Sequence, residues 1–162
     1  MDKVSICLLT YNRAGLISQT IETILNQSLS DFELIINDNC SSDETESICR
    51  EFAKQDNRIR YYRNQTNLGL TGNYQAAFDR SSEKYVAFLH DSDLYHPDLL
   101  SNWLDALERY PSAAFVFNSI EAIDFEDRLI SSSFHEYPPL IHPGFKLRDE
   151  MLSQWGSPVN GM

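Results

Sequence analysis

Short apolar runs alternate along the chain with stretches in which apolar residues recur every three or four positions. Residues 4–9, "VSICLL", form a continuous apolar run typical of a strand buried on both faces, and the run stops at "TYNR". Residues 14–27 show the spacing of a helix packed on a sheet. The same reasoning predicts four further strands and three further helices: strands over 32–36, 58–62, 85–89 and 113–118, and helices carrying 48–53, 74–81 and 97–109.

This alternation predicts an α/β fold, with a mostly parallel sheet and helices on both faces. Residues 119–134 predict two strands around the turn "DFEDR", which we expect to extend the sheet. The Pro-rich segment 136–145 has no predicted structure.

Three local signals concern the loops between these elements. Ser41 followed by Glu44 suits a capping box for the second helix, and Asp43 suits a turn or cap role. The tripeptide "NLG" at 67–69 predicts a turn in which Gly69 relaxes the backbone limits.

Polar side chains follow three of the predicted strands, at the edge of the sheet where α/β folds bind ligands. They are Thr10 and Tyr11 after the first strand, Asp38 and Asn39 after the second, and Asp91 and Asp93 after the fourth. Together they offer an aromatic face for a base, polar groups for its edge and two carboxylates for a divalent cation. Each has a simpler explanation alone: Tyr11 could pack a loop, Asp38 could serve a turn, and the last two could cap a helix. Two acids at the end of a buried strand nevertheless favour a site.

The composition restricts the partners. The chain has 162 residues, 42% of them hydrophobic, which suits one domain. Its 13 basic and 24 acidic residues give a net charge of −11, which argues against nucleic acid or an anionic membrane as the main partner. An acidic chain can still bind phosphates through a metal ion.

The cysteines and the hydropathy bear on the compartment. Cys7, Cys40 and Cys49 show no zinc-binding spacing, which favours a reducing compartment. No signal sequence and no transmembrane segment of about 20 apolar residues is evident, so we expect a cytoplasmic location, peripheral to the membrane at most in the full-length protein.

Four segments resemble, in order and spacing, the nucleotide-sugar-binding half of family 2 glycosyltransferases. They are "VSICLLTYNR", "DFELIINDNCSSDET", "NLG" and "YVAFLHDSDLYHPDLL", and the resemblance covers about residues 3–125. It implies the GT-A fold, which is Rossmann-like, and transfer of a sugar from a nucleotide diphosphate donor, such as a UDP-sugar, with inversion and with Mn²⁺ or Mg²⁺. The acceptor, a saccharide or another molecule, is not implied.

The resemblance also implies roles for the residues at the strand ends. Thr10 and Tyr11 line the base pocket, Asp38 and Asn39 recognise the base edge, and Asp91 and Asp93 form the Asp-x-Asp motif that contacts donor and metal. The chain departs from the family pattern at Asn39, which replaces the usual second acid, and after "NLG", where no basic residue precedes Arg80. We expect one glycosyltransferase domain that continues past this chain, with residues 1–125 as the donor half, 126–162 as the start of the acceptor half, and the general base beyond Met162.

Three other classes of protein share some of these sequence features with an active transferase. A catalytically silent nucleotide-sugar-binding or scaffold domain would keep the same donor residues. A receiver-like phosphate acceptor also gathers aspartates at strand ends, but it requires a lysine after its last strand, which this chain lacks. A dinucleotide-dependent dehydrogenase is weaker, because "TYNRAG" follows the first strand and not G-x-G-x-x-G.

Overall fold

The computed structural model describes residues 4–124, 126 and 128–133. The chain divides into two compact units, Met1–Asn102 and Trp103–Met162, which are treated separately. The division expected at residue 125 between a donor and an acceptor half stays a prediction.

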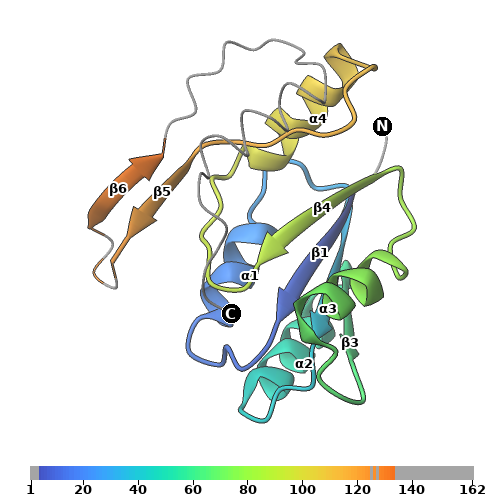
Figure 1. Cartoon of the computed structure of the whole chain (residues 1–162), viewed down its shortest axis with the longest axis vertical. Coiled ribbons are helices and arrows are strands. Elements are labelled where there is room, and N and C mark those ends of the chain that lie inside the picture. Colours follow the sequence, from blue (N-terminus) through green and yellow to red (C-terminus); the bar gives the residue numbers. More distant parts are fainter. Residues whose placement is uncertain (1–3, 125, 127, 134–162) are drawn as a thin grey trace. The chain divides into compact units, whose positions relative to one another are not determined.

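The first unit contains a four-stranded sheet in which every neighbouring pair is parallel (Figure 1). Its strands are β1 Val4–Thr10, β2 Phe32–Asp38, β3 Ile59–Arg63 and β4 Tyr85–His90, in the order β3-β2-β1-β4. The two central strands are almost entirely buried, as their continuous apolar runs predict, whereas β3 and β4 mix buried and exposed positions. The first four predicted strands are therefore confirmed, with ends shifted by one or two residues.

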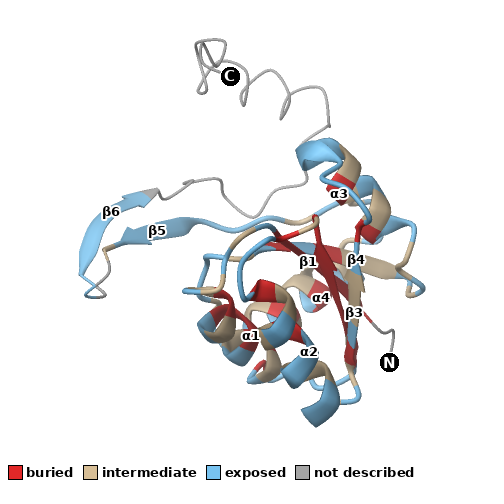
Figure 2. Ribbon diagram, turned by 90° about the horizontal axis from the view of Figure 1, so that it is seen from below, coloured by how far each residue is buried: buried red, intermediate tan, exposed pale blue. Residues whose placement is uncertain are grey.

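Helices cover both faces of this sheet, as predicted (Figure 2). They are α1 Ile17–Leu25, α2 Thr45–Gln55 and α3 Gly69–Phe78. On one face, Cys7, Leu9 and Ile35 form a buried cluster with Ala77 of α3. Side chains alternate along a strand, so buried residues such as Ile36 point to the opposite face, where α1 and α2 contact each other.

The predicted capping box at the start of α2 is wrong. The helix begins at Thr45, and Glu44 makes no side-chain capping bond. The hydroxyl of Ser41 is used elsewhere, because it donates to the carboxylate of Asp38 at 2.6 Å. Asp43 serves the turn, as predicted, since its Oδ1 accepts the N–H of Thr45 at 3.0 Å.

A fourth helix, α4 Leu99–Arg109, crosses the boundary between the units and begins two residues after Pro97. Within the second unit, β5 Ile120–Ile123 and β6 Leu129–Ser133 form the predicted antiparallel hairpin. The expectation that it extends the main sheet is wrong, because it forms a separate two-stranded sheet.

The strand predicted at residues 113–118 is also absent from the described structure. Phe115 and Phe117 are 57% and 46% exposed, so these two aromatic side chains lie at the surface of the described structure. An apolar run becomes a strand only when another strand satisfies its backbone, which a local pattern does not report. The segment 136–145 lies outside the described residues. Of the helices described, none combines the length and the apolar character needed to cross a membrane.

Candidate functional site

The loop after β1 is joined by hydrogen bonds to the loop after β2. The N–H of Asn39 donates to the carbonyl of Thr10 at 2.9 Å, and the N–H of Asn12 donates to the hydroxyl of Ser41 at 2.9 Å. Asn12 adopts a positive φ of 52°, and its Oδ1 accepts the N–H of Ser42 at 2.8 Å. The first two pairs of predicted site residues therefore lie side by side at the carboxyl edge of the sheet.

The end of β4 reaches the same edge. Leu9 pairs with His90, and the carboxylate of Asp91 accepts the N–H of Tyr11 at 3.2 Å. The guanidinium of Arg13 lies 3.3 Å from the other oxygen of this carboxylate. Arg13 was not among the predicted site residues, although it belongs to the quoted "TYNR", because its partner is 78 positions away. Asp91 thus links the loop after β1 to the loop after β4.

Asp93 is exposed and lies on the turn that follows. Its backbone carbonyl accepts the hydroxyl of Thr20 in α1 at 3.0 Å. The turn is held by Tyr95, whose hydroxyl donates to the carbonyl of His90 at 3.1 Å and accepts its N–H at 2.8 Å. Burial raises the pKa of Tyr95, and the negative charges of Asp93 and Asp91 act in the same direction.

Asp38 is fully buried, and protein groups surround its carboxylate. One oxygen accepts the N–H and the hydroxyl of Ser41, at 2.8 and 2.6 Å. The other accepts the hydroxyl of Tyr61 at 2.7 Å, with the Nε of Arg63 at 3.7 Å. Burial, and then the hydrogen bond to Asp38, raise the pKa of Tyr61. No local sequence pattern predicts this role of Tyr61, because Asp38 lies 23 positions away.

The residues at the end of β1 differ in exposure. Tyr11 is 43% exposed, so an aromatic face is available at the edge of the sheet. Thr10 is 2% exposed, and its hydroxyl has no hydrogen-bond partner among the described residues. A buried hydroxyl without a partner is uncommon in native proteins, where such groups are nearly always satisfied.

Asp91 and Asp93 are two carboxylates that closely follow β4. No group of three or more His, Cys, Asp or Glu residues able to hold a metal occurs within the described part of the chain. Two carboxylates suit Mg²⁺ or Mn²⁺ when phosphate oxygens and water supply the remaining ligands. The donor set therefore fits a cation that arrives with a diphosphate.

Aromatic, amide and carboxylate groups thus gather at the carboxyl ends of the parallel strands, the edge where open α/β sheets bind their ligands. A family model described as "Glycosyl transferase family 2" matches residues 5–159. The chain therefore belongs to glycosyltransferase family 2, in agreement with the resemblance and against the receiver-like and dehydrogenase alternatives.

Two curated relatives illustrate the match. Over 108 residues the chain is 39% identical to a GalNAc(5)-diNAcBac-PP-undecaprenol beta-1,3-glucosyltransferase of Campylobacter jejuni, a region that covers 66% of this chain and 34% of that protein. Over 132 residues it is 31% identical to a chondroitin synthase of Escherichia coli, covering 82% and 19%. The chain thus spans about a third of the first relative's length and about a fifth of the second's.

Solved structures confirm the GT-A fold. Staphylococcus aureus TarS 1-349 in complex with UDP-GlcNAc aligns with a TM-score of 0.62 and 20% identity, over 67% of this chain and 32% of that one. The mannosyltransferase PcManGT of Pyrobaculum calidifontis, in complex with GDP-Man and Mn²⁺, aligns with a TM-score of 0.62 and 20% identity, over 74% and 35%. At this identity the likeness concerns the fold.

Proposed function

We propose that this chain is the donor-binding part of a glycosyltransferase that moves a sugar from a nucleoside diphosphate, most simply a UDP-sugar, to a saccharide or another acceptor. The observation that carries the proposal is the meeting of three strand ends at one edge, where Asp91 contacts the backbone of Tyr11. Relatives named as sugar transferases and a neighbour holding UDP-GlcNAc support it.

The roles follow from exposure and chemistry. Tyr11 stacks on the base, because its ring is exposed at the edge. Thr10, Asp38 and Asn39 form the floor beside it, since all three are buried at the ends of β1 and β2. The hydroxyl of Thr10, which lacks a partner within the described residues, can turn toward a bound nucleotide.

Asp91 and Asp93 would hold Mn²⁺ or Mg²⁺ together with the diphosphate of the donor. The cation supplies Lewis acidity, which stabilises the charge that the leaving diphosphate develops. Asp91 is kept in place by Arg13 and by the N–H of Tyr11, whereas Asp93 is exposed. Transfer with inversion then needs a general base near the acceptor, which we place beyond Met162.

The proposal also includes the division of the domain into two halves and the location of the enzyme in the cell. We assign residues 1–125 to the donor half and 126–162 to the start of the acceptor half. The first relative is named for an undecaprenol-linked acceptor. A cytoplasmic enzyme at the periphery of the membrane would be suited to such an acceptor.

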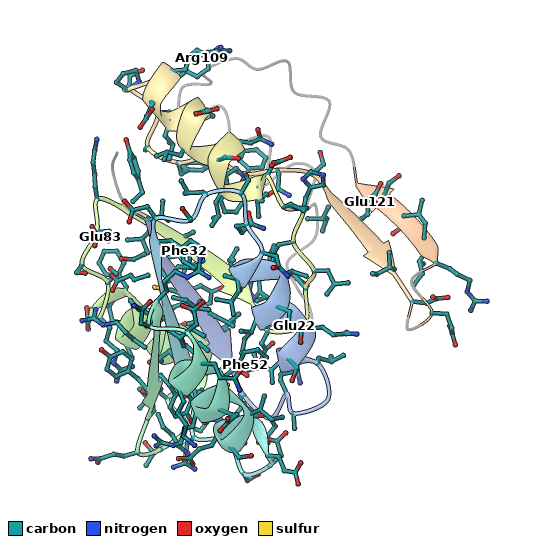
Figure 3. The ribbon with its side chains drawn as sticks, turned by 180° about the vertical axis from the view of Figure 1, so that it is seen from behind. Glu22, Phe32, Phe52, Glu83, Arg109 and Glu121 are labelled. Carbon is teal, nitrogen blue, oxygen red and sulfur yellow. The ribbon has the colours of Figure 1, made fainter. Side chains whose placement is uncertain are left out.

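The test is calorimetric titration of the chain with UDP, GDP and dTDP, each with and without Mn²⁺. The variant Asp93→Asn removes one exposed negative charge from the candidate site. Glu22→Gln removes one from the exposed surface of α1 and serves as the matched control (Figure 3). We expect binding of one nucleotide that requires Mn²⁺, is weakened at least tenfold by Asp93→Asn and is unchanged by Glu22→Gln.

Two other outcomes are informative. Equal binding by both variants would show that Asp93 does not hold the cation. Absence of nucleotide binding under every condition would contradict the proposal for this chain and favour a silent scaffold domain.

A further inference from the structure

The side chain of Asn39 is 5% exposed, and its amide is fully engaged within the protein. Its Oδ1 accepts the N–H of Leu68 at 2.9 Å and an N–H of the Asn64 amide at 3.2 Å. Its Nδ2 donates to the Oδ1 of Asn67 at 2.8 Å and to the carbonyl of Gly69 at 3.3 Å. A primary amide has two donor hydrogens and two acceptor lone pairs, so all four positions are used.

Every one of these partners lies in residues 64–69, which we call the β3–α3 loop. This loop contains the "NLG" element, and Gly69 has the positive φ of 69° that favours glycine. The Oδ1 of Asn67 also accepts the N–H of Gly69 at 2.8 Å. Asn39 and Asn67 together therefore fix the backbone of the loop where it enters α3.

In space the β3–α3 loop lies beside the end of β2, where the candidate site is. The N–H of Asn64 donates to the carbonyl of Asp38 at 2.8 Å, and the Sγ of Cys40 lies 3.6 Å from the carbonyl of Gln65. On its outer side the loop is open to solvent, because residues 65–70 are all exposed. A nucleotide held beside Asp38 and Asn39 must therefore lie against this loop.

A buried cluster of side-chain amides holds Asn39 and the start of the β3–α3 loop in position. The Asn64 amide donates to the Oδ1 of Asn73 at 2.9 Å as well as to Asn39. Asn73 in turn accepts from the Nδ2 of Asn37 at 2.6 Å. Because Asn64 shares its donors between Asn39 and Asn73, the orientation of the Asn39 amide is fixed by the core and not by a ligand.

From these contacts we infer that Asn39 is a positioning residue, which sets donor affinity by holding the β3–α3 loop as a wall of the donor pocket and does not itself read the base. The inference rests on the proposed donor site. Direct reading of a base edge by Asn39 would break at least one of its four internal hydrogen bonds, and the group left behind would be buried and unsatisfied.

The chemistry of an acid at this position makes the inference testable. In Asn39→Asp the carboxylate would face the Asn67 Oδ1 and the Gly69 carbonyl, which are both acceptors, and both donated bonds would be lost. Asn67→Ala loosens the same loop from its exposed side and leaves Asn39 intact. Asn57→Asp adds the same charge at an exposed turn between α2 and β3 and serves as the control.

The experiment measures dissociation constants for UDP, GDP and dTDP in the presence of Mn²⁺, together with hydrogen exchange at the amides of Leu68 and Gly69. We expect Asn39→Asp to weaken every nucleotide that the unaltered chain binds by the same factor, about tenfold, so that the ratios between bases stay constant. Asn67→Ala should weaken them in the same uniform way but less. Exchange at both amides should be faster in both variants and unchanged in Asn57→Asp.

Three results would overturn the inference. One is a change in the ratio between bases in Asn39→Asp with unchanged exchange, because Asn39 would then read the base. Another is faster exchange with unchanged affinity, because the loop would then be no wall of the pocket. If the unaltered chain binds no nucleotide, the proposed function fails and the donor part of the inference with it, while the exchange rates still decide whether Asn39 holds the loop.

Discussion

Replacing Tyr61 by phenylalanine removes one hydroxyl from the surroundings of the buried Asp38 carboxylate. That hydroxyl donates at 2.7 Å to the oxygen that Ser41 does not contact. The cationic group that remains beside this oxygen among the described residues is the Nε of Arg63, 3.7 Å away, which exceeds hydrogen-bond distance. The change therefore leaves a fully buried, charged acceptor without its shortest hydrogen bond on that side.

The magnitude follows from the kind of bond that is lost. A hydrogen bond to a charged group contributes about 1.5–3 kcal/mol to the free energy of unfolding. Phenylalanine keeps the ring, including its contact with the guanidinium of Arg50 at 4.9 Å, so little packing is lost. We expect a loss of about 2 kcal/mol, which for a chain of this size lowers the melting temperature by about 4–8 °C.

The assay is urea denaturation at neutral pH, followed by fluorescence and circular dichroism. Tyr62→Phe is the matched control, because Tyr62 is the next residue on β3 and its hydroxyl makes no hydrogen bond to the described residues. Its loss should therefore cost less than about 0.5 kcal/mol. Equal destabilisation by the two variants would refute the reasoning, since the Asp38 carboxylate would then not depend on the Tyr61 hydroxyl.

Two further predictions concern other parts of the first unit. Burial acts to raise the pKa of Glu33, but hydrogen bonds from Ser5 and Ser82 and the charge of Arg60 outweigh it and hold the pKa below its usual value. The unfolded chain then binds more protons, so this stabilisation is present above about pH 4.5 and is lost as the pH falls. Glu33→Gln should therefore reduce the slope of the unfolding free energy against pH, measured between pH 3 and 6. An unchanged slope would contradict the assignment. In Gly69→Ala the added Cβ would meet no atom within 4 Å, but the alanine must adopt a φ of 69°. Denaturation should therefore show a loss of about 1–2 kcal/mol in the free energy of unfolding. An unchanged free energy would mean that the loop changes its conformation.

Complete burial explains why local patterns predicted the two central strands. β1 and β2 lie in the middle of the sheet, and their uninterrupted apolar runs identified them. In α1 the predicted apolar stripe is buried at Ile17, Ile21 and Ile24. Residues 113–118 show the limit of this reasoning, because the same kind of run forms no strand in the described part of the chain and leaves Phe115 and Phe117 exposed.

The sequence predicted where the site lies on the sheet but not the hydrogen-bond partners of its side chains. The rule that the carboxyl ends of parallel strands share one edge was enough to bring Tyr11, Asp38 and Asp91 together. What each side chain does there depends on partners far along the sequence. Asn39 binds residues 25 to 30 positions away, and Asp91 binds the backbone 80 positions away, so no local spacing could reveal either role.

Strand order explains why carboxylates that look alike in the sequence differ in the structure. Asp38 ends a central strand, where β3 on one side supplies Tyr61 and Arg63 and the loop after β2 supplies Ser41, so its charge is satisfied internally. Asp93 follows β4, which is one of the two edge strands of the described sheet, and it remains exposed. A carboxylate at a central strand end is thus expected to organise the sheet edge, whereas one beyond an edge strand can exchange water for a cation and a diphosphate. The order β3-β2-β1-β4 therefore gives a physical reason for the proposal, already made from the Asp-x-Asp pattern, that a cation would bind at the end of β4 and not at the end of β2.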